Sequence, residues 1–114
     1  MPQDKDDSSI DWTNLFSATS IVLVGDPLSG IFNVEEHIKL INPKSEIVVV
    51  HDRTAITLFE KADLILEIVQ NLRGTQVERV LIIQKWKGHE VPGNLVPFLI
   101  KPNKIEPDTK ARVV

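Results

Sequence analysis

The chain has 114 residues, of which 42% are hydrophobic and 25% charged, and its formal net charge is −3. This composition is typical of one globular domain rather than a disordered chain. The absence of cysteine excludes disulfides, thiolate catalysis and thiolate metal sites. Nucleic-acid binding depends on a basic surface, so a nucleic-acid partner is not expected for this mildly acidic chain.

Polar residues dominate the start of the sequence. Residues 1–9 include three aspartates and two serines, and they predict a disordered acidic tail. We find neither a targeting segment nor an apolar run that could span a bilayer, which predicts a cytoplasmic protein with no membrane partner. We expect a single α/β domain over residues 10–102 and a loose C-terminal tail over residues 103–114.

The first half of this domain predicts two strands with a helix between them. Residues 20–25, SIVLVG, form a continuous apolar run, typical of a strand buried on both faces. Asn33 followed by Glu36 is a capping-box pattern, which predicts a helix that ends before Pro43. Residues 46–51, EIVVVH, predict a second buried strand.

The second half predicts a longer helix and two more strands. The helix is expected over residues 55–73, with Gly74 as its C-terminal cap and a helical apolar stripe of Leu58, Ala62, Ile65, Val69 and Leu72. Its apolar surface is wider than this stripe, which predicts burial on more than one side, including against a second subunit. Strands are expected at residues 77–84 and 95–100, the latter at a sheet edge because Pro97 has no N–H.

Strands that alternate with helices predict the α/β class. We expect a small Rossmann-like layered fold, with a mostly parallel sheet of about four strands, two main helices and the final strand at an edge. In such sheets, ligands bind beyond the carboxyl ends of the strands. The loops expected there supply our candidate ligand-binding residues, which are Gly25, Asp26, Gly30, Asp52, Arg53, Lys87 and His89.

Residues 21–53 resemble the opening βαβ unit of dinucleotide-binding Rossmann folds. Gly25 follows the first strand, Gly30 comes five residues later, and Asp52 ends the second strand, where that family binds ribose hydroxyls. Two departures are clear, since Pro27 replaces the middle glycine and Asp52 comes 27 positions after Gly25. The alternative is that both glycines only permit a tight strand-to-helix connection, and we assign no cofactor.

Other polar groups suggest weaker alternatives. His51 and Asp52 could form an acid–base pair, but adjacent strand residues point to opposite faces, which favours a surface turn. A metal site would need His51 and Asp52 to meet His89 and Glu90, and we predict no metal site and no catalytic residues. Trp86 lies between two lysines, which favours packing or an interface over nucleic-acid stacking.

The leading hypothesis is a non-enzymatic binding or regulatory module that acts through protein–protein contacts. We expect a homo-oligomer, most simply a homodimer, and a protein partner is also compatible with the sequence. The candidate interface residues are Leu66, Trp86 and Phe98. The alternative is a domain or small enzyme that binds a nucleotide or phosphorylated metabolite at the carboxyl ends of the strands.

Overall fold

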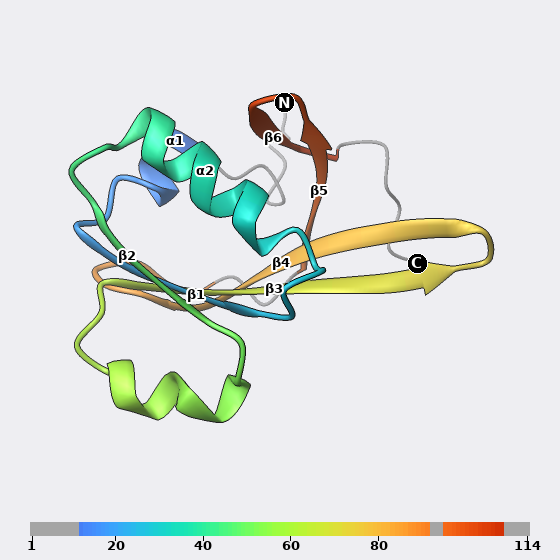
Figure 1. Ribbon diagram of the computed structural model, residues 1–114. Coiled ribbons are helices and arrows are strands. Elements are labelled where there is room, and N and C mark those ends of the chain that lie inside the picture. Colours follow the sequence, from blue (N-terminus) through green and yellow to red (C-terminus); the bar gives the residue numbers. More distant parts are fainter. Residues whose placement is uncertain (1–11, 92–94, 109–114) are drawn as a thin grey trace, which may run out of the picture.

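One curled, mixed sheet of six strands organises the protein (Figure 1). The computed structural model describes residues 12–91 and 95–108. The strands are β1 (Ser20–Gly25), β2 (Glu46–Val50), β3 (Leu64–Arg73), β4 (Gln76–Trp86), β5 (Val96–Lys101) and β6 (Lys104–Pro107). The helical segments are α1 (Trp12–Leu15), α2 (Ile31–Ile41) and the 3₁₀ segment η1 (Arg53–Phe59).

The strand order, β2-β1-β3-β4-β5-β6, contradicts the predicted fold class. Only β2, β1 and β3 are parallel, and the three remaining pairings, β3–β4, β4–β5 and β5–β6, are antiparallel. The Rossmann-like fold with a mostly parallel four-stranded sheet is therefore wrong. β6 lies within the residues expected to begin the C-terminal tail.

The error arises at residues 55–73, which are not one helix. Residues 53–59 form η1, and residues 64–73 form β3. The two ends of the supposed helical stripe, Leu58 and Leu72, are 79% and 78% exposed. The residues that are buried instead alternate along the chain, as in a strand: Leu64, Leu66 and Ile68 all face the main core.

Two tight turns connect β3 to β4 and β5 to β6 in the antiparallel half of the sheet. Arg73 pairs with Gln76, so Gly74 and Thr75 form a two-residue hairpin loop, and the positive φ of Gly74 (64°) is that of a type II′ turn. Gly74 is therefore a hairpin residue and not the helix cap that we predicted. Between β5 and β6, the loop is Pro102 and Asn103, where Asn103 takes the positive φ (66°).

β5 is not an edge strand, because it pairs with both β4 and β6. Pro97 lies opposite Val80 of β4, but the β5–β6 ladder begins only at Phe98. The Pro97 carbonyl accepts a hydrogen bond from the Asp108 N–H (2.9 Å), so the ring nitrogen faces the same side, just past the end of β6 at Pro107, and points away from β4. Pro97, the second residue of β5, is therefore compatible with an interior strand.

Helical segments cover both faces of the sheet (Figure 1). α1 and α2 pack on one face over the main core, which includes Phe16, Leu23 and Ile38. η1 packs on the other face over Val22 and Ile65. α2 begins after Gly30, whose φ is 99°, so Asn33 is not its N-cap. In the described part of the chain, no helix combines the length and apolar character needed to cross a bilayer.

A buried histidine joins α2 to β6. The N–H of Ile105 donates a hydrogen bond to His37 Nδ1 (3.1 Å), so this ring nitrogen must be unprotonated. Burial, aided by the positive charge of Lys104, lowers the pKa of His37 below its ordinary value of 6.5. The folded protein therefore favours the neutral imidazole.

This histidine predicts loss of stability in mild acid. As the pH falls below about 6.5, the unfolded chain binds a proton at His37 before the folded chain does, so the free energy of unfolding decreases until the pH passes the lowered pKa. Chemical denaturation of the wild type and His37→Gln between pH 8 and pH 5 measures this effect. The variant should show a flatter pH dependence, and equal slopes would contradict the assignment.

Gly25 predicts a steric requirement where β1 leaves the sheet. A Cβ at this position would lie 2.7 Å from the Ile68 carbonyl oxygen, which belongs to the backbone and cannot rotate away. We expect Gly25→Ala to lower the free energy of unfolding by about 2 kcal/mol, the usual scale of overpacking. Urea denaturation measures this, with Gly88→Asn as the control because Gly88 has open space around it. A loss in Gly25→Ala no larger than in the control would refute the close approach.

Candidate functional site

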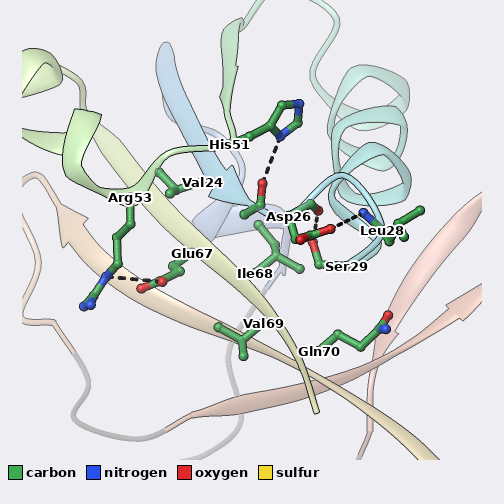
Figure 2. Close-up of a pocket in the computed structure, with 11 residues that line it drawn as sticks. Val24, Asp26, Leu28, Ser29, His51, Arg53, Glu67, Ile68, Val69 and Gln70 are labelled. Atoms are coloured by element: carbon green, nitrogen blue, oxygen red, sulfur yellow. Dashed lines mark hydrogen bonds and ion pairs between the residues drawn. The ribbon is translucent and has the colours of Figure 1, made fainter. Parts of the chain in front are cut away.

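A cavity of about 440 Å³ lies beyond the carboxyl ends of β1 and β2 (Figure 2). It forms because β1 pairs with β3 only as far as Gly25 and Ile68, whereas β3 continues to Arg73. Beyond Ile68, the edge of β3 that faces away from β4 therefore has no paired strand among the described residues. The lining residues are Val24, Gly25, Asp26, Leu28, Ser29, His51, Arg53, Glu67, Ile68, Val69 and Gln70.

The turn after β1 forms one wall of this cavity. Asp26 Oδ1 accepts a hydrogen bond from the Leu28 N–H (2.8 Å), and Ser29 Oγ donates one to the Asp26 carbonyl (2.6 Å). Both are local bonds of the kind that shape Asp- and Ser-containing turns. They carry the chain away from β3 and into α2, with the Asp26 side chain on the surface.

His51, directly after β2, is oriented by the end of β1. Its Nδ1 lies 2.9 Å from the Gly25 carbonyl oxygen, and since a carbonyl can only accept, Nδ1 carries the proton. The Phe32 ring meets the imidazole edge to face, with the centroids 5.8 Å apart. These contacts fix the ring beside α2, and Figure 2 shows its second nitrogen pointing away from the cavity.

The two charged groups on the opposite wall pair with each other (Figure 2). Arg53 Nε lies 3.3 Å from Glu67 Oε2, and Gln84 Nε2 donates a hydrogen bond to Glu67 Oε1 (2.7 Å). The Glu67 side chain is only 14% exposed, so these partners compensate a largely desolvated carboxylate. Two carboxylates, those of Asp26 and Glu67, thus line the cavity against one guanidinium, a balance that does not favour an anionic ligand.

The structure brings together only part of the predicted ligand-binding set. Gly25, Asp26 and Arg53 line the cavity, whereas Gly30 lies outside it, against the side chains of Arg79 and Ile100. Asp52 instead caps η1, because its Oδ1 accepts hydrogen bonds from the Thr54 N–H (2.9 Å) and hydroxyl (2.7 Å).

Lys87 and His89 lie at the opposite end of the sheet from the cavity. The N–H of Lys87 donates a hydrogen bond to the carbonyl of Asp63, which directly precedes β3, and the two side chains form an ion pair (3.7 Å). His89 stacks on Trp86, with the centroids 4.0 Å apart. β4 runs antiparallel to β3, so its carboxyl end cannot join those of β1 and β2. Within residues 12–91 and 95–108, no group of three or more potential metal ligands is gathered.

The predicted interface residues have different surroundings. Leu66 and Phe98 are buried in the core of the single chain, so neither offers surface to a partner. Trp86 is half-buried, packs against that core and stacks on His89. The predicted apolar helix that was to carry Leu66 into a contact does not exist, because this segment is β3.

An open edge of the sheet is the feature that sequence reasoning missed. Among the residues that the structure describes, β2 pairs only with β1, and although four of its five residues are β-branched and apolar, none is fully buried. β1, by contrast, buries four consecutive residues. We interpreted EIVVVH as a second buried strand, and the run from Ile47 to Val50, which has neither charge nor proline, was the signal that could have marked an unprotected edge.

Comparisons with known proteins identify no relationship. No family model matches the chain, and no curated protein has a significant match to its sequence.

Asp52 provides a test of a structural role against a ligand-binding role. The hydrogen bonds from the Thr54 hydroxyl and N–H lower the pKa of Asp52 below 3.8, so its contribution to stability is present above that pH and is lost as the pH falls through the lowered pKa. We expect Asp52→Ala to lower Tm at pH 7, and the difference from wild type to shrink in strong acid.

The matched variant is Asp52→Ser, which keeps an oxygen acceptor for the cap. It should lose less Tm than Asp52→Ala in the same thermal scans. If Asp52→Ala melts at the wild-type temperature, Asp52 is not a structural cap and its assignment to ligand binding becomes the better one.

Proposed function

We propose that this protein is a non-enzymatic interaction module that binds other polypeptides by strand addition at the open edge of β2. The observation that carries the proposal is the exposure of β2, an apolar strand whose outer edge no other described strand covers. The cytoplasmic location expected from the sequence belongs to the same proposal.

The contrast between the two sheet edges supports this function. β6, at one edge, has four residues and carries Lys104, Glu106 and Pro107, which are the features that natural proteins use to block strand pairing. β2, at the other edge, has Ile47 to Val50 in an unbroken apolar run, with a charge only at Glu46. One edge is protected and the other is not, which favours a functional use of the unprotected edge.

Exposed apolar side chains beside β2 add to this support. Val48 is 41% exposed on the strand itself, and Phe32 of α2, which contacts His51 just beyond the strand, is 48% exposed. An added strand would give β2 both backbone hydrogen bonds and cover for these side chains, the two contributions that strand addition combines.

Peptide selection tests the proposal. Random seven-residue peptides displayed on phage are selected on the wild-type protein, then synthesised with a fluorescent label and titrated by anisotropy. We expect β-branched peptides that bind at least tenfold more weakly to Val48→Lys, because a lysine on the edge opposes pairing. Circular dichroism verifies that this variant, altered at an exposed position, remains folded.

The control variant is Val77→Lys, which introduces the same change at a valine of similar exposure (47%) on β4. It should bind the selected peptides as the wild type does. Peptides that bind Val48→Lys with wild-type affinity, or a selection that yields none, would overturn the proposal.

A further inference from the structure

We infer that His37 and the Ile105 N–H form an acid-sensitive latch, and that protonation of His37 releases the β5–β6 hairpin from α2 while the rest of the sheet stays folded. The release exposes Ile105, which is only 1% exposed in the closed state, and opens this end of the main core. The latch lies at the opposite edge of the sheet from β2, so it does not depend on the proposed function.

One buried hydrogen bond forms the latch. The Ile105 N–H donates to His37 Nδ1 (3.1 Å), which joins the middle of β6 to the middle of α2 across 68 residues of sequence. β6 is an edge strand, and its ladder partner is β5. The imidazole therefore supplies an acceptor to an N–H that donates toward α2 rather than to a neighbouring strand.

Protonation is incompatible with this contact. A protonated imidazole carries a hydrogen on both ring nitrogens, so Nδ1 would meet the Ile105 N–H as donor against donor. The ring lies in a confined place, since His37 is 9% exposed and the Phe16 ring packs on it edge to face, with the centroids 5.8 Å apart. Burying a charge without an acceptor is costly, so the charged form favours a state in which His37 reaches water.

The charged groups around His37 do not offset a positive charge. On α2, none of the residues one turn before or after His37 titrates, and the residues of α1 carry no charge. β6 contributes Lys104, whose charge opposes protonation, and Glu106, which is already paired with Lys104 (2.8 Å). On β5, Lys101 lies opposite Lys104 and adds a second positive charge. Opening of the hairpin is therefore the way in which a protonated His37 is relieved.

The β5–β6 hairpin is joined to the sheet more weakly than the other strands. Within the described part of the chain, β5 pairs with β4 only from Arg79–Phe98 to Leu81–Val96, and β6 pairs only with β5. The β3–β4 ladder extends from Leu64 to Arg73, and β1 has a paired strand on each side. Elements with few contacts open at a lower free energy than the whole domain, so the hairpin can leave α2 without global unfolding.

Native-state hydrogen exchange tests the latch, because it measures the opening of single amides. Protection factors, which correct for the effect of pH on intrinsic exchange, are measured by NMR at pH 7.5 and pH 5.5, with and without low concentrations of urea. We expect the Ile105 amide to lose protection several-fold at pH 5.5. The upper limit is about tenfold, because in the open state the pKa of His37 returns to its ordinary value of 6.5. Urea should change this exchange little, since a local opening exposes little surface.

Two histidine variants separate the latch from other effects of acid. His37→Gln keeps a side-chain oxygen as acceptor and has no titrating group, so its Ile105 amide should be equally protected at both pH values. The matched control is His51→Gln. His51 Nδ1 already donates to the Gly25 carbonyl (2.9 Å), so protonation breaks no bond there, and this variant should lose protection at Ile105 as the wild type does.

The wild type alone can overturn the inference. Equal protection of the Ile105 amide at the two pH values would show that His37 does not control the opening. If the Ile105 amide exchanges together with the amides of the β3–β4 ladder, with the same dependence on urea, acid causes global unfolding and not release of the hairpin. A loss in His37→Gln as large as in the wild type would assign the acid effect to another group. None of these outcomes depends on whether the chain binds peptides at β2.

Discussion

The rest of the structure depends on β1, which has a parallel neighbour on each side and helical cover on both faces. Its inner residues, including Leu23, meet the layer of α1 and α2, and its outer residues, including Val22, meet η1. β1 ends at Gly25, where the backbone approaches Ile68 too closely for any side chain, so β3 continues to Arg73 paired with β4 but not with β1. The cavity and the β3–β4 arm, residues 69–78, both follow from this early end.

Hydrophobic patterning was sufficient for the elements near β1 and failed farther along the chain. β1, β2 and α2 were predicted close to their observed bounds, because continuous β-branched runs and a helical stripe are distinct signals. Residues 58–72 carry apolar residues at both periods, and the helical spacing from Leu58 to Leu72 competed with the alternation of Leu64, Leu66 and Ile68. The two-residue loop of Gly74 and Thr75 was the local signal that favoured a hairpin.

That one misassigned segment accounts for the errors in the candidate site. A helix over residues 55–73 would have made the following strand parallel to β1 and brought Lys87 and His89 beside Asp26. A hairpin reverses the strand, so these residues lie at the other end of the sheet beside Asp63. The part of the site that depended only on the β1–α2 and β2–η1 connections, Gly25, Asp26 and Arg53, was placed together. Strand order, and with it the open edge of β2, leaves no periodic pattern in a sequence.

The pairing of β1 with β3 also has a consequence for the order of folding. Ile21 pairs with Leu64, 43 positions later, whereas the β3–β4 hairpin closes over the two residues of its loop. Hairpins form in about 1–10 μs, and closing a longer loop costs more chain entropy. We expect the hairpin to form first, and β1 and β2, whose partners Ser20 and Glu46 are nearer in sequence than Ile21 and Leu64, to pair with each other before β1 joins β3. During synthesis, β1 therefore has no β3 to pair with until residues 64–73 have left the ribosome.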